Sequence, residues 1–289
     1  MKLSSAKYDF QYHEKRRLFQ EEFKQVSDIE FFHSLPEGFR HRAEFSIKGN
    51  FGSKQYVMTI DGKREQIDSF PIASTKIQEL MYQLLEQINA CKALSEKLFQ
   101  VEFQTSRNQD SMISLIYHRK LDVSWENAAR NLNKKLQATI IGRSRKQKLS
   151  YGNDYVIETY KSFKSKYSLR LYEQCFSQTN PEICEKMLSW VEKNLIFSDD
   201  DVVELHCGLG TFTMLLSKIY RKVLATENSR PSFAGLKENL RLNKCFNVNV
   251  ARLSGHETLQ AISNERSFNR LGGIDISEFK FNTIFLDPP

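Results

Sequence analysis

Two hydrophobic periods alternate along the first part of the chain. Residues 1–27 place Leu18, Phe19, Phe23 and Val26 at helical spacing, which predicts an amphipathic helix. After it, short runs alternate apolar and polar side chains as strands do, and two longer stretches return to the helical period. The predicted strands are 42–48, 55–60, 64–69, 99–105, 111–118, 138–142, 147–151 and 168–174, and the predicted helices are 75–90 and 125–137.

Local signals support these elements. Asp61 and Gly62 predict a hairpin turn between two of the strands, because both residue types tolerate the backbone angles that such a turn requires. Ser74 directly precedes helix 75–90 and can cap its N-terminus. This mixture predicts an α+β first domain over residues 1–174.

The second part of the chain has a regular rhythm of strands and helices. The predicted strands are 201–206, 222–227, 247–251 and 282–286, and the predicted helices are 181–195, 212–220, 231–243 and 255–263. The first of these helices has Ile183, Met187, Trp190, Val191 and Leu195 along one face. Strictly alternating strands and helices predict a parallel, doubly wound α/β sheet, here over residues 175–289.

Composition excludes several classes of protein. With 289 residues and 40% hydrophobic residues, the chain can bury a core, and no run approaches the length of a membrane span. The N-terminus lacks an apolar signal region, so we expect a cytoplasmic protein. The five cysteines include no C-x-x-C pair, which argues against a zinc or iron–sulfur site and favours free thiols.

Positive charge is concentrated in one stretch of the chain. The net charge is +7, and residues 141–170 hold eight Lys or Arg against two Asp or Glu. Five aromatic residues are interleaved there: Tyr151, Tyr155, Tyr160, Phe163 and Tyr167. Cations neutralise phosphates and rings stack on unpaired bases, so the stretch suits single-stranded or looped RNA. A solvated basic hairpin with its rings turned into the core is the alternative.

A glycine-containing turn predicts a nucleotide-binding strand end. In E-L-H-C-G-L-G-T-F at 204–212, Gly208 and Gly210 separate a strand from a helix, so the backbone can approach a ligand. Glu227 ends the next strand, 17 residues after Gly210, where a carboxylate can accept hydrogen bonds from ribose hydroxyls. Thr213 stands where a full dinucleotide fingerprint needs glycine, which argues against NAD.

Two further segments point to methyl transfer. Asp287-Pro288-Pro289 follows an apolar strand, a feature of methyltransferases that act on a planar base or amide; a simple strand-ending turn is the alternative. Together with the glycine turn and Glu227, it predicts a methyltransferase. Gln178, in F-S-Q-T-N-P, either reaches the methionine part of a cofactor or caps the following helix.

Segments along nearly the whole chain resemble tRNA (uracil-5-)-methyltransferases of the TrmA type. They are F-R-H-R-A-E-F-S-I, I-D-S-F-P-I-A-S, K-L-F-Q-V-E-F, S-L-I-Y-H-R-K-L-D, I-I-G-R-S-R-K, C-F-S-Q-T-N-P, E-L-H-C-G-L-G-T-F, V-L-A-T-E, F-N-R-L-G-G-I-D and F-L-D-P-P. The related ribosomal-RNA enzymes carry a four-cysteine cluster and an added N-terminal barrel, so the resemblance favours the tRNA branch.

The resemblance implies a fold, a reaction and a cofactor site. The fold is a Rossmann-like class I methyltransferase domain preceded by a mixed α+β RNA-binding domain. The reaction is methylation of C5 of uridine 54 in the tRNA T-loop by S-adenosylmethionine. The implied cofactor-binding residues are Gln178, His206, Gly208, Gly210, Thr211, Glu227 and Asp287. His206 replaces the family's usual Tyr or Phe, and Leu209 and Thr211 each replace an Asn.

The implied RNA-binding residues come from several segments. Arg40, Arg42, Phe99 and His118 fall in RNA-facing segments of the family, and the basic stretch adds Arg143, Arg145 and Lys146. A buried Phe99 in the core is the alternative for that residue. The expected partner is the tRNA T-arm, bound by a monomer without a metal, an iron–sulfur cluster or a membrane.

The resemblance names no catalytic residue inside this sequence. In the family a cysteine thiolate adds to C6 of uracil and a glutamate removes the C5 proton, and both lie after the D-P-P motif. We therefore expect both residues beyond Pro289, in a sequence truncated after the fourth strand, and we expect the 289-residue chain as it stands to be inactive. Such a truncation would leave Ile284–Leu286 at an open apolar edge. Cys207 is given no nucleophilic role. A non-catalytic RNA-binding protein, or a methyltransferase for another base or amide, remains the alternative.

Overall fold

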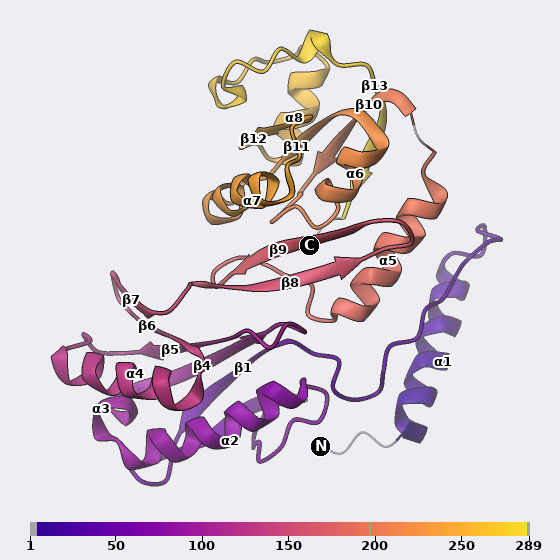
Figure 1. The fold of residues 1–289 in the computed structure, drawn as a ribbon. Helices are drawn as coiled ribbons and strands as arrows, with labels where there is room; N and C mark the ends of the chain where they lie inside the picture. The colour runs from indigo at the N-terminus through magenta and orange to yellow at the C-terminus, as the bar shows by residue number, and fades with distance from the viewer. Residues whose placement is uncertain (1–4, 197, 288–289) are drawn as a thin grey trace. The chain divides into compact units, whose positions relative to one another are not determined.

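The computed structural model describes residues 5–196 and 198–287, which form two compact units (Figure 1). The first unit comprises Met1–Val156 with Thr179–Ile183, and the second comprises Ile157–Gln178 with Cys184–Pro289. Residue 174, the predicted end of the first domain, lies within the second unit.

A seven-stranded sheet forms the centre of the first unit. Its order is β3-β2-β1-β4-β5-β6-β7, and the described pairs are antiparallel except β5 with β6. The strands are β1 Arg42–Lys48, β2 Gln55–Ile60, β3 Lys63–Gln66, β4 Leu98–Thr105, β5 Ser111–Tyr117, β6 Thr139–Ser144 and β7 Gln147–Tyr151. The β5–α4–β6 crossover explains the parallel pair, because parallel neighbours need a connection across the sheet.

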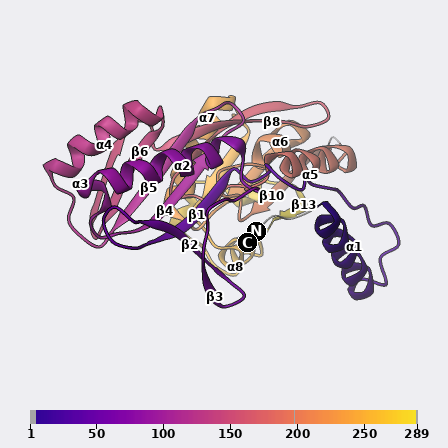
Figure 2. The same ribbon diagram turned by 90° about the horizontal axis from the view of Figure 1, so that it is seen from below.

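Helices cover one face of this sheet (Figures 1 and 2). They are α2 Thr75–Ala90, α3 Lys92–Ser95 and α4 Val123–Leu136. The predicted cap is confirmed, since the Ser74 hydroxyl accepts a hydrogen bond from Ile77 N. Buried apolar side chains of α2 and α4 recur at helical spacing and join the core of the sheet. The Trp125 ring lies so close to β6 that a Cβ at Gly142 would be 2.2 Å from its Cη2 atom.

The N-terminal helix differs from the prediction. Helix α1 spans Ser5–Glu22, and residues 1–4 lie outside the described residues. Leu18, Phe19 and Val26 are exposed, and Phe10 is 70% exposed, so the predicted apolar face is not buried within the described chain. A helix without a buried face gains little from packing, and polar contacts such as that of Tyr8 Oη with the Ser34 carbonyl, at 2.7 Å, hold it instead.

A four-stranded parallel sheet forms the centre of the second unit, as predicted. Its order is β12-β11-β10-β13, and the described pairs are parallel. The elements are β8 Tyr155–Lys161, β9 Lys166–Tyr172, α5 Pro181–Asn194, β10 Ser198–Leu205, α6 Thr213–Ile219, β11 Tyr220–Thr226, α7 Arg230–Asn243, β12 Val248–Ala251, α8 Gly255–Ile262, the 3-10 turns η1 Asn269–Leu271 and η2 Ile276–Glu278, and β13 Phe281–Leu286.

Two details of this unit were not predicted correctly. Strand β8 was missed; it pairs with β9 to form a separate two-stranded sheet. Trp190 was assigned to the apolar face of α5 but is 44% exposed, whereas Cys184, Leu188 and Val191 are buried. The buried face of α5 is therefore rotated away from Trp190.

Candidate functional site: a glycine loop and a cationic hollow

The glycine loop begins where β10 ends. His206, Gly208 and Gly210 all have positive φ angles, of 57°, 56° and 92°. Two features exclude a side chain at Gly210. Its positive φ disfavours other residues, and a Cβ there would lie 2.6 Å from Leu236 Cδ1. No atom lies within 4 Å of a Cβ built at Gly208, so that backbone faces open space. The loop thus leaves bare backbone open at the carboxyl end of the sheet, the edge at which ligands bind in open α/β sheets.

The Glu227 carboxylate is fixed against this loop. It follows β11 and accepts a hydrogen bond from Gly208 N at 3.0 Å and another from Ser229 N at 2.6 Å. Its side chain is half-buried. A carboxylate has about four lone-pair positions, so these two bonds orient the group and leave capacity for ligand hydroxyls.

A second carboxylate, Glu204, lies buried beneath the loop. It accepts a hydrogen bond from Thr213 Oγ1 at 2.6 Å. Burial raises the pKa of Glu204 to about 8, against the lowering effect of the Thr213 hydrogen bond, and the nearby Asp287 charge raises it further. Asp287 was predicted as a cofactor-binding residue, but neither Glu204 nor Thr213 was predicted to act at the site. The available signal was a carboxylate within the run V-V-E-L at 202–205, where its neighbours are apolar and a buried acid requires a partner.

Gln178 and Asp287, which are 109 positions apart in the sequence, are brought together within the second unit. Gln178 Nε2 donates to Asp287 Oδ2 at 3.3 Å. Burial raises the pKa of Asp287, and this hydrogen bond opposes that effect. Asn180 Oδ1 accepts from Ile183 N, which is the capping contact at the start of α5, so the helix-capping alternative for Gln178 is wrong. Pro288 and Pro289 lie outside the described residues.

The remaining positions of the loop are held in different ways. His206 is exposed, and its Nε2 atom would lie 3.1 Å from a Cβ at Gly255. Thr211 is half-buried, and its carbonyl accepts a hydrogen bond from Tyr167 Oη at 2.6 Å. The carbonyl of Leu209 accepts from the buried Asn239 Nδ2 at 3.0 Å. Neither anchor was predicted, because Tyr167 and Asn239 both lie far from the loop in sequence.

Cys207 is unsuited to nucleophilic chemistry. The residue is buried, and burial raises the pKa of its thiol well above the usual value, with the charges of Glu204 and Glu227 acting in the same direction. The thiolate is the reactive form of cysteine, so a protonated, buried thiol is inert.

An open hollow of about 740 Å³ lies in the first unit. Phe99, from the start of β4, and His118, after β5, stack there with ring centroids 3.8 Å apart and an interplanar angle of 10°. Phe99 is half-buried and His118 is exposed, so the alternative of a core phenylalanine is wrong. The β6–β7 hairpin adds Arg143, Arg145 and Lys146 to the same hollow. Five of the seven predicted RNA-binding residues therefore line one surface.

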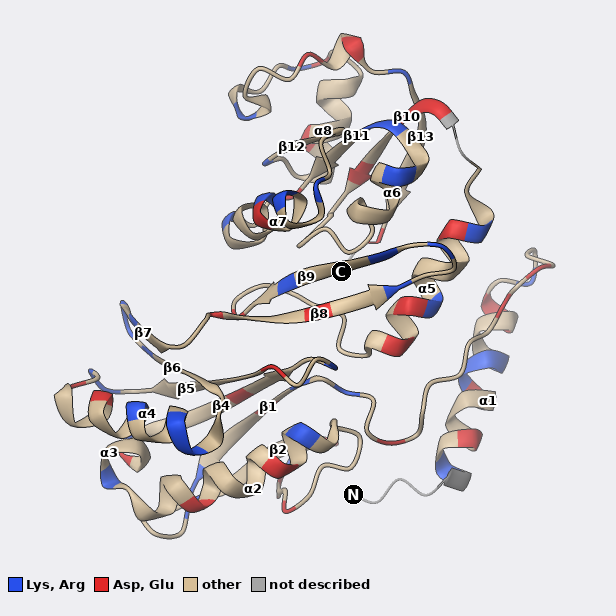
Figure 3. Ribbon diagram, in the orientation of Figure 1, with Lys and Arg blue, Asp and Glu red and all other residues tan. Residues whose placement is uncertain are grey.

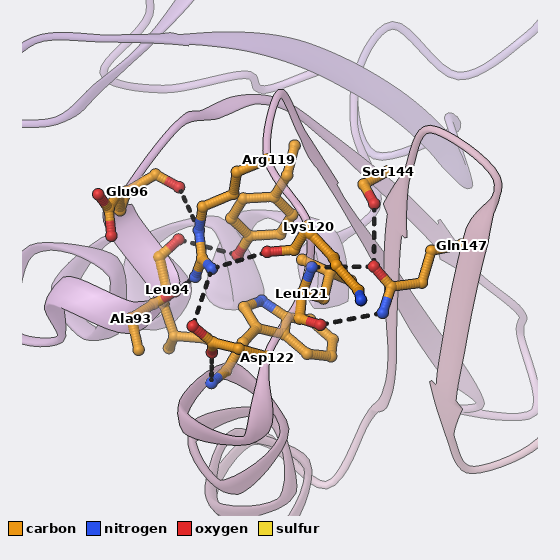
Figure 4. Close-up of polar contacts among 11 residues, drawn as sticks. Ala93, Leu94, Glu96, Arg119, Lys120, Leu121, Asp122, Ser144 and Gln147 are labelled. Atoms are coloured by element: carbon orange, nitrogen blue, oxygen red, sulfur yellow. Dashed lines mark hydrogen bonds and ion pairs between the residues drawn. The ribbon is translucent and has the colours of Figure 1, made fainter.

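Gln147 ties the two sides of this hollow together (Figure 4). From the β6–β7 hairpin its Oε1 accepts from Leu121 N at 2.9 Å, and its Nε2 donates to the Leu121 carbonyl at 3.0 Å. The same Oε1 also accepts from Ser144 Oγ. One amide therefore fixes the segment after His118 against the basic hairpin.

Arg119 holds together the backbone segments that line and support the hollow. Its guanidinium donates to the backbone carbonyls of Ala93, Glu96 and Lys120 at 2.7, 3.0 and 3.0 Å (Figure 4). Its Nη1 also lies 3.5 Å from the Asp122 carboxylate. These contacts direct the cation toward the protein backbone.

Arg40 and Arg42 lie elsewhere in the first unit. Strand pairing sets Arg42 opposite Gln104, at the far end of β4 from Phe99. Arg40 Nε donates to the Arg42 carbonyl, and Arg42 pairs with Glu102 at 3.8 Å. Neither arginine lines the hollow, so the seven predicted residues do not form one surface.

The aromatic residues of the basic stretch differ in exposure: some are buried in the core, and one is exposed as stacking on an RNA base requires. Tyr160 and Tyr167 are buried, as the core alternative expects. Tyr151 is half-buried and donates to Glu126 Oε2 at 2.9 Å. Phe163, in contrast, is 62% exposed.

Neither a metal centre nor a membrane helix is found in the part of the chain that the structure describes. No three His, Cys, Asp or Glu side chains gather there to hold a metal. None of its helices is long and apolar enough to cross a bilayer.

The family model described as tRNA (Uracil-5-)-methyltransferase matches residues 7–289. The chain belongs to this family. A tRNA/tmRNA (uracil-C(5))-methyltransferase of Cellvibrio japonicus is 40% identical over 99% of this chain and 79% of its own length. One of Acinetobacter baylyi is 42% identical over 90% of this chain and 74% of its own length. The predicted family membership is therefore confirmed.

A solved structure supports the fold. The crystal structure of Pyrococcus abyssi tRNA (uracil-54, C5)-methyltransferase in complex with S-adenosyl-L-homocysteine matches with a TM-score of 0.66 and 15% identity. The match covers 84% of this chain and 63% of that one. Together with the parallel sheet of the second unit, it confirms the predicted Rossmann-like methyltransferase fold for this member of the tRNA (uracil-5-)-methyltransferase family.

Proposed function

We propose that this protein binds S-adenosylmethionine at the glycine loop and methylates C5 of uridine 54 in the T-loop of tRNA. The observation that carries the proposal is the fixed Glu227 carboxylate beside the open backbone of Gly208, in a chain of this family. The bacterial relatives are named for methylation of uracil C5, and the Pyrococcus abyssi enzyme is named for uracil 54 of tRNA, so both support this reaction and this target.

The residues at the loop fit an adenosine-containing cofactor. Glu227 has unused acceptor capacity for the two ribose hydroxyls, and the exposed His206 ring can stack on a purine. Gln178 and Asp287 form the polar pair for the amino acid part. When bound, the cofactor supplies an electrophilic methyl group on a sulfonium.

The hollow of the first unit fits an RNA loop. The stacked Phe99–His118 pair offers an aromatic face to an unpaired base, and Arg143, Arg145 and Lys146 offer charge to the phosphates around it. RNA loops are recognised through such splayed bases, whereas an RNA helix hides its base edges in a narrow groove. We therefore propose the T-arm as the part of tRNA that this hollow contacts.

The chemistry at C5 needs a nucleophile and a base. We propose that neither is Cys207 or Glu204, because the thiol is protonated and buried, and the carboxyl lies beneath the loop at an elevated pKa. The family's thiolate and glutamate would perform those steps.

Methyl transfer to unmodified tRNA tests the proposal. We expect the protein that includes the family's nucleophile and base segment after the D-P-P motif, given S-adenosylmethionine labelled in its methyl group, to label a tRNA transcript. The label should lie on C5 of uridine 54 after nuclease digestion and mass spectrometry. A transcript with cytidine at position 54 is the matched control and should stay unlabelled. Label at another nucleotide would favour a different base as target, and tight tRNA binding without S-adenosylhomocysteine binding would favour a non-catalytic RNA-binding protein.

The same proposal includes a cytoplasmic monomer without a metal or iron–sulfur cluster. The tRNA substrate named for the relatives supports the cytoplasmic location only. Light scattering of the purified protein and metal analysis check the oligomeric state and the metal content.

A further inference from the structure

The tip of the β8–β9 hairpin exposes an aromatic ring near two cations. Phe163, at the turn, is 62% exposed. Lys164 Nζ lies 5.7 Å from the centroid of its ring, and Lys193 Nζ, from α5, lies 5.4 Å from the same centroid. This cluster, which we call the Phe163 tip, belongs to the second unit and is separate from the residues of the hollow.

Carboxylates of α5 hold the tip in place. Glu185 Oε1 accepts from Lys161 N at 2.7 Å. Glu192 accepts from Lys164 N at 2.7 Å and from Ser165 Oγ at 2.6 Å. Both acids thus direct oxygen atoms toward the hairpin itself. The turn is closed by Ser162 N donating to the Ser165 carbonyl at 2.8 Å, so the ring is carried on a fixed loop.

The charge around the ring is positive. Lys161, Lys164, Lys166 and Lys193 are all exposed, and Figure 3 shows Lys and Arg in blue at this end of the hairpin and on the neighbouring α5. Glu185 and Glu192 accept hydrogen bonds from the hairpin and keep their charge, but the four exposed lysines outnumber these two acids, so the cluster is positive. A polyanion with an apolar flat group matches this surface, whereas a purely apolar partner would have to desolvate the lysines.

We propose that the Phe163 tip is a second RNA-binding site, which stacks an unpaired base on Phe163 while the lysines contact the flanking phosphates. Rings on which bases stack, within a positive groove or patch, are the usual device for binding single-stranded or looped RNA. The inference rests on the proposed function for the identity of the RNA, which is tRNA. It adds a contact that the hollow does not provide.

Replacing the ring tests the stacking. We expect Phe163→Ala to weaken binding of an unmodified tRNA transcript about tenfold, the effect of losing one stacked base. Phe163→Trp should restore wild-type affinity, because a larger ring stacks at least as well, and Phe163→Leu should not. The matched control is Phe246→Ala, which removes a ring that is 89% exposed in the same unit.

Replacing the cations tests the phosphate contacts. A plot of log affinity against log salt concentration has a negative slope. The Lys164→Ala/Lys193→Ala variant should make this slope less steep by about 1.4 to 1.8, the effect of two lost phosphate contacts. Thermal melts of each variant should match the wild type, since the altered side chains lie at the surface.

The outcomes separate this inference from the proposed function. If Phe163→Ala binds tRNA as tightly as Phe246→Ala does, or if Phe163→Leu binds as well as Phe163→Trp, the Phe163 tip is not a stacking site. Specific capture of an acidic protein segment at an unchanged tRNA affinity would also overturn it. In each case the protein would still bind S-adenosylhomocysteine and label uridine 54. If the proposed function is wrong, in contrast, the wild-type protein itself lacks this binding or this labelling.

Discussion

Carboxylates at the glycine loop are held by hydrogen bonds within the protein, whereas two cations of the hollow are exposed to solvent. Glu204 is buried against Thr213, and Glu227 accepts two backbone hydrogen bonds. In the hollow, Arg145 and Lys146 are exposed at a hairpin turn. We therefore propose that the loop is preorganised for a small ligand, while the hollow attracts a large anion by charge. We expect changes at the loop to alter folding and ligand affinity together, and changes to the exposed cations of the hollow to alter RNA affinity alone.

The largest effect is expected beneath the loop. Glu204→Ala leaves the Thr213 hydroxyl buried without its partner and opens a cavity, which should lower the free energy of unfolding by about 3 kcal/mol. Urea denaturation measures this. Glu204→Gln, which keeps the shape and an acceptor without charge, is the control and should cost much less.

The raised pKa of Glu204 adds a pH dependence with a defined sign. The folded state holds the proton up to a pKa of about 8, against an ordinary value of 4.5. The resulting contribution to stability is fully present below pH 4.5 and is lost as pH rises toward 8. Glu204→Gln should remove this decline. If the two proteins show the same pH profile of unfolding, the carboxyl is not held neutral by burial.

The next largest effect is expected in the hollow, and on RNA binding only. Arg145→Ala/Lys146→Ala should weaken tRNA binding by about tenfold or more and lower the salt slope by about 1.4 to 1.8, with stability unchanged within about 0.5 kcal/mol. Filter binding across a range of salt concentrations measures both quantities. Lys134→Ala/Lys135→Ala removes the same charge from exposed positions of α4, outside the hollow. Equal losses in both variants would mean that general charge, and not the hollow, binds the RNA.

A smaller effect is expected at the rim of the loop. Glu227→Gln turns one of the two acceptor atoms into a donor that faces Gly208 N or Ser229 N, and it weakens acceptance from a ribose. We expect about tenfold weaker binding of S-adenosylhomocysteine by calorimetry, consistent with a lost charged hydrogen bond. Glu265→Gln is the same change at an exposed position of this unit. An unchanged affinity at Glu227→Gln would place the ribose elsewhere.

The elements that were predicted correctly are those whose signals, such as hydrophobic periodicity and capping residues, lie within the element or next to it in the sequence. The helix predicted at 75–90 has those bounds, and the four parallel strands of the second unit each begin and end within three residues of the prediction. Strand β8 was not predicted because the buried Glu158 occupies a position where the alternating pattern needs an apolar residue. A single buried acid was enough to interrupt the alternation of apolar and polar residues that identifies a strand.

Contacts between distant segments could not be read from the sequence. Gln178 reaches Asp287 across 109 positions, and only the folded sheet shows this. Arg42 and Phe99 both belong to predicted RNA-facing segments, yet the register of β1 on β4 separates them. Which face or end of a strand a residue occupies depends on pairing, which residue types alone do not specify.

The smallest effect is expected at Gln147, and it distinguishes position from charge. Gln147→Ala removes the hydrogen bonds to Leu121 and Ser144 that join the two sides of the hollow. Because the cations remain but are less well ordered, tRNA affinity should fall about threefold, with a loss of about 1 kcal/mol in stability and an unchanged salt slope. The control is Gln83→Ala, the same change at an exposed site of α2. A lowered salt slope would instead mean that Gln147 helps to place a cation directly on a phosphate, and the hollow would then depend on preorganisation as the glycine loop does.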